Sequence, residues 1–396
     1  MKRRFSIPWA DLAPLLDGTS SVDASRIEIR SIDDAEDFLE SYGYDWKVSD
    51  DREELDRLRL EAIEFVERDL LFDKPAVSIP REVRQEKDIR KLLFWSSEMA
   101  FPERQRWAWV IFRLIHIFSH TSTYFDEKYG DAIREQILGR FRPHVAHNIE
   151  TGELTLGTGP TAIKLNAFEI RGRKSRSSVA IKLLHKREAG GTDIFDWVGV
   201  RMVTEDRYDA LRVVRYLREH NVINFMQLQP GRTRNTLLDI DRIENEVHEL
   251  NELVRAGKLP DYVIESELRE RVNRHAYPSP PEKSYNPNSS LAYHSIQFTC
   301  RQRIRVRDRS GAAVSSFLEK VPLRANPIVK TLRVYADRIE PAGDIRFLFP
   351  FELQILDQPS YELSRSGLAS HQIYKDRQRQ RAIERLFGED FGTDHD

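Results

Sequence analysis

Near residue 145 the spacing of apolar residues changes, and with it the kind of secondary structure that the chain can form. Before this point, apolar residues recur every three or four positions, which is the period of an amphipathic helix. Examples are Leu55, Leu58, Ala62 and Phe65. After it, short alternating runs stand between turn-forming residues, as over 146–170, and this pattern indicates strands. We therefore expect a mostly helical N-terminal region over 1–145 and an α+β region over 146–390.

The N-terminal region is predicted to contain several helices. The first begins at Ser31, because acidic residues follow it and favour the positive end of a helix. A second covers 51–72 and ends before Pro75, and a long helical stretch runs from 80 to 142. We interpret the tryptophan-rich part of that stretch, 95–112, as core rather than as a platform on which bases stack.

After residue 145 the chain alternates strands and helices, which indicates an α/β or α+β fold. The predicted strands are Asp196–Thr204, Tyr293–Cys300, Thr331–Ala336 and Arg346–Leu356. The predicted helices are Ser177–His185, Tyr208–His220 and Ser360–Leu386. Residues 225–290 are interpreted as an insertion. It holds a helix with apolar residues spaced 3,4,3,4 from Ile240 to Val254, and a Pro-, Ser- and Asn-rich loop over 276–290.

Charge and composition limit the partners. The net charge is −2, so any binding of phosphate must come from a local cluster of cations. Such a cluster covers 171–187 and contains Arg171, Arg173, Lys174, Arg176, Lys182, Lys186 and Arg187. The single cysteine, Cys300, excludes an internal disulfide and Cys-rich metal sites. No run approaches the roughly 18 apolar residues of a membrane span, and none follows the basic N-terminus as in a signal peptide. We therefore expect a cytoplasmic protein with no membrane partner.

Two carboxylates in apolar strands are the main candidates for chemistry. Glu352 lies in the strand FPFELQIL, where it shares one face with Gln354 while apolar residues point to the other. Asp196 opens a second strand, and Tyr293, which could stack on a base, opens a third. Carboxylates on neighbouring strands can hold Mg²⁺ together with substrate phosphate. Each feature alone has a plainer interpretation: Asp196 as a turn residue, Glu352 as a residue of an edge strand, and the basic cluster as a solvated surface. The site is therefore predicted from the occurrence of all of them together.

Five motifs in a fixed order carry a resemblance to a known family. They are RKSRSSVAIKLLHK, DWVGVRMV, AYHSIQF, FELQILD and GLASHQIYK. In this order they resemble the RelA/SpoT synthetase family over about residues 165–380. The resemblance implies a nucleotidyltransferase-like mixed β-sheet flanked by helices. It also implies a Mg²⁺-dependent pyrophosphokinase, which transfers pyrophosphate from ATP to the 3′-hydroxyl of a guanine nucleotide and so makes an alarmone of the stringent response.

The resemblance also implies a role for individual residues. Contacts to the ATP phosphates are implied for Arg173, Lys174, Ser178, Lys182 and Arg201. Contacts to the acceptor are implied for Tyr293, Ser295, Gln354 and Lys283. Asp196 and Glu352 are the implied catalytic pair and the implied ligands of Mg²⁺, and Glu352 is also expected to polarise the attacking hydroxyl.

Several positions depart from the family's pattern. Gly172 stands in place of an arginine, Ala292 of a glycine, Gln297 of a histidine, and Leu356-Asp357 of an Arg-Thr pair. These departures bear on the acceptor more than on ATP. Three hypotheses therefore remain open: alarmone synthesis, a toxin-like relative that acts on tRNA or an adenine nucleotide, and a nucleotide-binding regulatory protein without catalysis.

Other features have simpler interpretations. His116 and His120 are four positions apart, but no acidic residue stands between them as in a metalloprotease helix, so we interpret them as a packed pair. The only His-Asp dipeptide is His395-Asp396, so no metal-dependent hydrolase is expected. For the N-terminal region, autoinhibition, formation of a homo-oligomer and binding of a protein partner remain open.

Overall fold

A computed structural model of the chain describes residues 27–74, 77–121, 124–171, 175–185, 198–275, 277–278, 294–307, 344–365, 371–388 and 391. The strand predicted near residues 331–336 lies outside these ranges, as does most of the predicted loop over 276–290. No helix in the described part of the chain is both long enough and apolar enough to cross a membrane.

The first part of the chain is helical, as predicted. Its helices are α2 (Ile32–Tyr42), α3 (Ser49–Phe65), α4 (Arg81–Gln85), α5 (Ile89–Ser96), α6 (Pro102–Thr121) and α7 (Tyr124–Leu138), and a single π-helical turn (Val66–Leu70) extends α3. Ser31 caps α2, because its hydroxyl accepts a 3.0 Å hydrogen bond from the backbone N–H of Asp34. The helix predicted to begin at Ser31 is therefore confirmed.

Within the described residues, seven strands form one mixed sheet. They are β1 (Val145–His147), β2 (Leu154–Leu156), β3 (Ile163–Arg171), β4 (Gly199–Thr204), β5 (Arg234–Asn235), β6 (Ile296–Arg307) and β7 (Asp344–Asp357). Their order is β1-β2-β3-β4-β7-β6-β5, and all neighbours are antiparallel except β4 and β7. The fold is therefore of mixed α+β type, with a mixed sheet flanked by helices, as expected.

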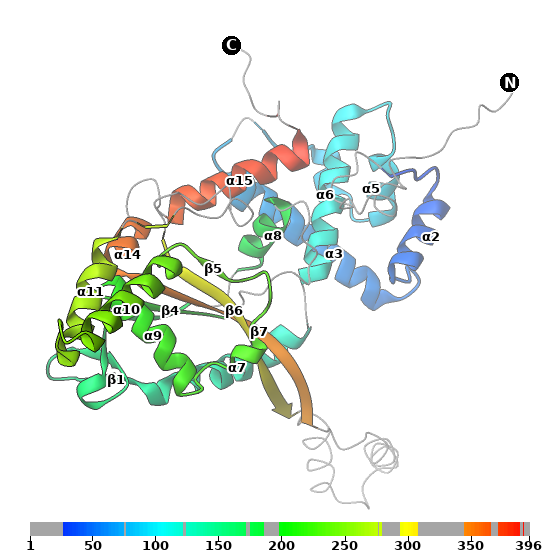
Figure 1. The fold of residues 1–396 in the computed structure, drawn as a ribbon. Coiled ribbons are helices and arrows are strands. Elements are labelled where there is room, and N and C mark those ends of the chain that lie inside the picture. The colour runs from blue at the N-terminus through cyan, green and yellow to red at the C-terminus, as the bar shows by residue number, and fades with distance from the viewer. Residues whose placement is uncertain are drawn as a thin grey trace, which may run out of the picture.

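Further helices lie around the sheet. They are α8 (Arg176–His185), α9 (Arg207–Glu219), α10 (Ile240–Arg255), α11 (Ile264–Arg274), α14 (Gln358–Arg365) and α15 (His371–Phe387). Helices α9, α10 and α11 lie together on one side of the sheet (Figure 1). The predicted helical spacing in α10 is confirmed in part. Ile243 and Leu250 are buried, but Ile240 is 42% exposed because it stands at the first position of the helix.

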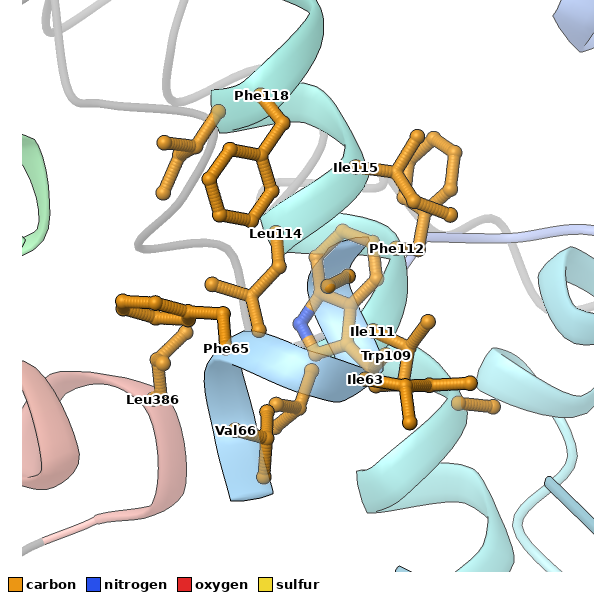
Figure 2. Close-up of a cluster of buried hydrophobic side chains, with 14 of the residues drawn as sticks. Ile63, Phe65, Val66, Trp109, Ile111, Phe112, Leu114, Ile115, Phe118 and Leu386 are labelled. Carbon is orange, nitrogen blue, oxygen red and sulfur yellow. The ribbon is translucent and has the colours of Figure 1, made fainter. Parts of the chain in front are cut away.

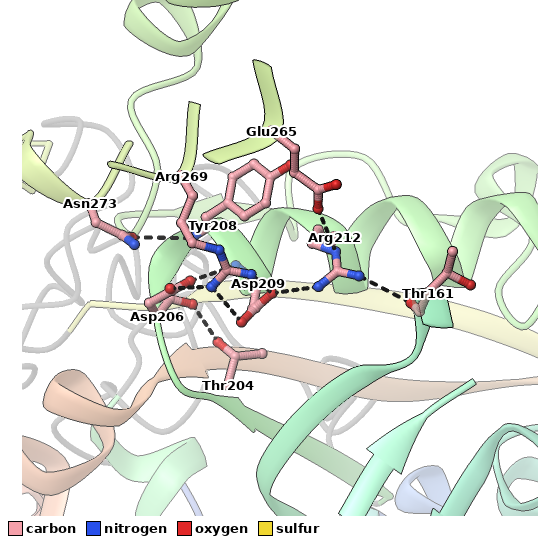
Figure 3. Close-up of polar contacts among 9 residues, drawn as sticks. All are labelled: Thr161, Thr204, Asp206, Tyr208, Asp209, Arg212, Glu265, Arg269 and Asn273. Atoms are coloured by element: carbon pink, nitrogen blue, oxygen red, sulfur yellow. Dashed lines mark hydrogen bonds and ion pairs between the residues drawn. The ribbon is translucent and has the colours of Figure 1, made fainter. Parts of the chain in front are cut away.

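An ionic cluster fastens the predicted insertion to α9 (Figure 3). Arg269 on α11 donates to both oxygens of Asp209 at 2.7 and 3.0 Å and to Asp206 at 2.5 Å. Asp206 is also the N-cap of α9, and Asp209 is buried in its first turn. Arg212 donates to Asp209 at 2.9 Å from the other side. Because Asp209 is buried and accepts from two guanidinium groups, it holds α11 at the start of α9.

The buried apolar residues form two main cores. The first core includes two helices from late in the chain. The first core joins α2–α6 with α8 and α15. Figure 2 shows Leu386 of α15 beside Phe65 of α3. The second core lies between the sheet and its helices and includes α7. The predicted division at residue 145 stays a prediction, but packing links α8 and α15 to the N-terminal helices.

Candidate functional site

The face of the sheet opposite the second core carries a polar patch. Phe351, Leu353 and Ile355 point into that core, as the alternation in β7 predicted. Glu352 and Gln354 therefore point to the opposite face. The register places two rows of side chains across the strands on that face. One row is Arg171, Gly199, Glu352 and Thr299, and the next is Glu169, Arg201, Gln354 and Gln297.

Two glutamines fix the carboxylate of Glu352. The side-chain amide of Gln297 donates to Oε2 at 2.8 Å, and that of Gln354 donates to Oε1 at 2.6 Å. Glu352 and Gln354 are both buried. A buried carboxylate needs partners, because unpaired burial of a charge costs several kcal/mol. The two amides supply hydrogen bonds without adding a positive charge, so they orient the carboxylate.

An arginine lies across a glycine to reach the same carboxylate. Arg171 on β3 places a guanidinium nitrogen 3.7 Å from Oε1 of Glu352, although β4 stands between their strands. Gly199 leaves room for this path, since a Cβ at this position would lie 3.1 Å from Cδ of Arg171, and the side chain would have to shift by a few tenths of an ångström. The sequence predicts Arg171 as part of the basic cluster, and its contact with Glu352 is seen only in the structure.

A second arginine links Gln354 to an acidic residue on β3. Arg201 donates to Oε1 of Gln354 from two nitrogens, at 3.3 and 3.2 Å, and to Glu169 at 3.2 Å. The phenol of Tyr361 on α14 also donates to Glu169. This bond, with burial, raises the pKa of Tyr361 above its ordinary value. The patch therefore continues from Gln297 to α14 as one network of hydrogen bonds.

The carboxyl end of β7 holds a separate buried acid. Asp357 accepts a 2.7 Å hydrogen bond from the phenol of Tyr277 and a 3.0 Å bond from the backbone N–H of Ser360, and so caps α14. The ring of Tyr277 stacks on His294 with centroids 4.0 Å apart. Burial lowers the pKa of His294. These contacts of Asp357 are structural, because they hold the start of α14 and the phenol of Tyr277.

Several predicted site residues lie in the described part, and the structure separates them into groups. Arg201, Gln354 and Glu352 share the polar patch. Ser295 is buried and exchanges hydrogen bonds with Thr236, so it connects β6 to the chain beside β5.

Ser178 and Lys182 belong to α8, which packs in the first core. The backbone N–H of Ser178 donates to the hydroxyl of Ser175 at 3.2 Å at the start of that helix. The phosphate contacts predicted for Ser178 and Lys182 stay predictions.

The remaining predicted residues lie outside the described ranges. They are Arg173, Lys174, Asp196, Lys283 and Tyr293. For Asp196, the nearest described residue is Val198, whose carbonyl accepts a 2.9 Å hydrogen bond from the backbone N–H of Glu352. The parallel pairing of β4 with β7 also confirms that the two strands predicted to carry the acids are neighbours.

Sequence reasoning missed Glu169 and Tyr361, and it assigned Arg171 to the basic cluster without placing it beside Glu352. Period-2 alternation could have placed Glu169 and Arg171 on one face of their strand, since they are two positions apart. It could not have shown that β3 pairs with β4, and nothing in the sequence points from Tyr361 to Glu169. Gln297 was noted only as a departure from the family's pattern.

The donor set bears on the predicted Mg²⁺. Among the described residues, no three His, Cys, Asp or Glu side chains gather into a metal-binding group. Mg²⁺ is usually held by one or two carboxylates together with substrate phosphates. The oriented carboxylate of Glu352 fits that kind of site, in which most ligands come from the nucleotide and from water.

The two histidines of α6 lie next to each other, and His116 contacts Tyr42 of α2 while His120 is exposed. The rings of His116 and His120 lie 4.5 Å apart, and Nδ1 of His116 shares a hydrogen bond with the phenol of Tyr42. Burial, with the charge of His120 as a lesser cause, lowers the pKa of His116 to about 4. His116 therefore belongs to the packing of the N-terminal helices.

Comparisons with known proteins identify no relative: no family model, no curated protein and no solved structure matches the chain. Evidence on function therefore comes from the residues of the polar patch and from their surroundings.

Proposed function

We propose that the polar patch around Glu352 is the active site of a Mg²⁺-dependent pyrophosphokinase with a nucleotidyltransferase-like sheet. The reaction would transfer pyrophosphate from ATP to the 3′-hydroxyl of a guanine nucleotide. The observation that carries the proposal is the buried carboxylate of Glu352, which two glutamines orient on the face it shares with Arg171 and Arg201.

Such a transfer requires alignment and compensation of charge more than covalent chemistry by the protein. The acceptor oxygen forms a bond to the β-phosphorus of ATP, the bond between that phosphorus and the bridging oxygen to the α-phosphate breaks, and AMP leaves. The proton of the hydroxyl must go to a base. Glu352 is the base that we propose, because its carboxylate is held in one orientation before substrate arrives.

Cations at the patch support binding of a polyphosphate. The guanidinium group of Arg171 lies beside Glu352, and that of Arg201 lies beside Gln354. Guanidinium groups bind phosphate through paired hydrogen bonds. Mg²⁺, when bound, would compensate charge on the phosphates, with Glu352 as its ligand from the described chain. Asp196, Lys174 and Lys182 keep the roles that the family resemblance implies.

The test is transfer of label from γ-labelled ATP. Purified protein is incubated with Mg²⁺ and GDP, GTP, ADP or bulk tRNA, and the products are separated by chromatography. We expect a labelled guanine nucleotide. The Glu352→Gln variant should lose transfer by about 10²-fold or more, the range for removal of a general base.

The matched control is Glu244→Gln, which changes an exposed glutamate on α10 in the same way. It should keep the rate of the unchanged protein, and thermal unfolding of both variants should show that the fold is retained. Transfer by Glu352→Gln at the normal rate would exclude the role of Glu352. ATP binding without transfer to any acceptor would instead favour a regulatory protein that has lost catalysis.

A further inference from the structure

One row of the polar patch continues onto the edge strand β5, where it ends in an arginine. Arg234 is paired with Gln297 in the antiparallel register of β5 and β6. Side chains of directly paired residues point to the same face of a sheet, so Arg234 stands on the face that carries Glu352. The neighbour of Gln297 on β6, Ile296, is buried in the second core and points to the opposite face.

Although β5 has only two residues, hydrogen bonds to the start of β6 fix its position. The backbone N–H of Thr236 donates to the carbonyl of Ser295 at 3.0 Å, and the hydroxyl of Thr236 accepts from the N–H of Ser295 at 3.0 Å. The side-chain oxygen of Asn235 accepts from the backbone N–H of Leu237 at 3.1 Å. The backbone that carries Arg234 is therefore held in one position beside β6.

Arg234 differs from the other arginines of the patch in its partners. Arg171 contacts Glu352, and Arg201 contacts Glu169. In the described part of the chain, no hydrogen bond or ion pair joins Arg234 to another residue, although its Nε is shielded from solvent. A shielded N–H without a partner costs stability, so a chain that keeps one is expected to use it for another purpose.

The two rows of the patch also carry one more cation than carboxylates. The cations are Arg171, Arg201 and Arg234, and the carboxylates are Glu169 and Glu352. Because the first two arginines are each paired with a carboxylate, the uncompensated charge lies at the β5 end. Such a charge attracts an anion, and a guanidinium group binds phosphate through paired hydrogen bonds.

The order of the strands places this charge on the acceptor side of the proposed reaction. In the order β3-β4-β7-β6-β5, Arg171 and Arg234 lie on opposite sides of Glu352, each on a strand two places away. Most of the residues that the family resemblance implies for ATP follow β3 in the chain. Ser295, which the resemblance implies for the acceptor, is instead bonded to Thr236 beside β5.

We propose that Arg234 binds the 5′-phosphates of the acceptor nucleotide while Glu352 takes the proton of its 3′-hydroxyl. This rests on the proposed function, for which it names a nucleoside 5′-diphosphate or 5′-triphosphate, rather than a free nucleoside, as the acceptor. The strands that carry the two residues are roughly 10 Å apart, since neighbouring strands are about 4.8 Å apart and β6 lies between them. This separation suits a nucleotide, whose 3′-hydroxyl and 5′-phosphates leave the ribose on different sides.

Binding is measured by isothermal titration calorimetry in the presence of Mg²⁺ and α,β-methylene-ATP. In this analogue a carbon replaces the oxygen between the α- and β-phosphorus, so no pyrophosphate is transferred. The two titrated ligands are GDP and guanosine, which differ only in the phosphates. Arg234→Met should weaken the binding of GDP by at least about tenfold, as for the loss of one charge-assisted hydrogen bond, and leave the binding of guanosine unchanged.

The matched control is Arg242→Met, which removes an exposed arginine of α10 and should change the binding of neither ligand. Thermal unfolding without ligand separates a binding role of Arg234 from a structural one. Arg234→Met should unfold at the temperature of the unchanged protein or above it, because methionine has no N–H that needs a partner. A clearly lower unfolding temperature, equal affinity of both proteins for GDP, an equal loss for GDP and guanosine, or no binding of GDP by the unchanged protein would each overturn the inference.

Transfer of label from γ-labelled ATP separates this inference from the proposed function. With GDP as acceptor, Arg234→Met should raise KM and leave kcat unchanged, as for a contact that is equally strong before and during transfer. If Arg234→Met loses GDP in the calorimeter but the unchanged protein transfers no label, the phosphate site is confirmed and the proposed reaction is wrong. If GDP receives label with the same KM in both proteins, the reaction stands and the role of Arg234 is wrong.

Discussion

Replacement of Arg113 by methionine should destabilise the first core and release the C-terminal end of α15. Arg113 is buried on α6, 6% exposed, and donates to the carbonyl oxygens of Leu386 at 2.9 Å and Arg385 at 3.2 Å. These carbonyls stand in the last turn of α15, where backbone acceptors lack helical partners and the helix dipole is negative. A cation on α6 therefore caps a helix that lies more than 270 positions later in the chain.

The size of the loss follows from these contacts. Two hydrogen bonds from a charged donor contribute about 3–6 kcal/mol, at about 1.5–3 kcal/mol each. Methionine keeps most of the volume of the side chain and removes the cost of keeping a guanidinium out of water, which offsets part of that loss. We therefore expect the free energy of unfolding to fall by about 2–3 kcal/mol.

Urea unfolding followed by tryptophan fluorescence suits this test, because Trp107 and Trp109 both lie in the first core. Arg106→Met on the exposed side of the same helix is the control and should change the free energy by less than about 0.5 kcal/mol. Leu386→Ala gives a comparison for lost apolar burial, at about 2–5 kcal/mol. A change below about 0.5 kcal/mol for Arg113→Met would show that the cap contributes nothing to stability.

Two other substitutions test further contacts. Burial, with a lesser effect of His120, holds the pKa of His116 at about 4, whereas the pKa of a histidine in an unfolded chain is about 6.5. The neutral ring therefore contributes fully to stability above about pH 6.5, and this contribution is lost as the pH falls toward 4. This loss amounts to at most about 3 kcal/mol of the free energy of unfolding. For His116→Asn, the free energy of unfolding should fall less steeply between about pH 6.5 and 4 than for the unchanged protein. Parallel curves of stability against pH for the two proteins would contradict this prediction. Arg269→Met should lower the free energy of unfolding by about 2 kcal/mol. This is less than the loss for a fully buried ion pair, because Arg269 is partly exposed and Arg212 still pairs with Asp209. Faster amide hydrogen exchange in α11 would report the loss, and Arg274→Met on the same helix should not show it.

Local patterns in the sequence were sufficient for most elements of the fold. The helix predicted from Ser31, the helix over 51–72 and the strand around Glu352 all depend on caps, prolines and apolar periodicity, which act over a few residues. The face shared by Glu352 and Gln354 follows from the pleat of one strand. Such predictions need no knowledge of what the element packs against.

Pairing and packing over long separations could not be predicted in this way. The path of Arg171 across Gly199 depends on the order of β3, β4 and β7, which no local pattern determines. The same is true of α8 and α15, which were predicted as helices of the second region but pack in the first core. Strand β6 was also predicted too short: it was expected to end at Cys300 but continues to Arg307, paired with β7 along this length.

The polar patch is not explained by stability alone. The next pair along this face of β4 and β7 is Val203 and Leu356, and both pack with Tyr361 in a small apolar cluster. Apolar residues at the positions of Glu352 and Gln354 would bury similar area there without the cost of taking a carboxylate out of water, and exchanges of this kind are often neutral or stabilising. The chain instead places a carboxylate, two amides and two guanidinium groups side by side. Charged and amide groups that are oriented at a cost to stability are typical of functional sites, and this cost is why we propose the patch as the site of the reaction.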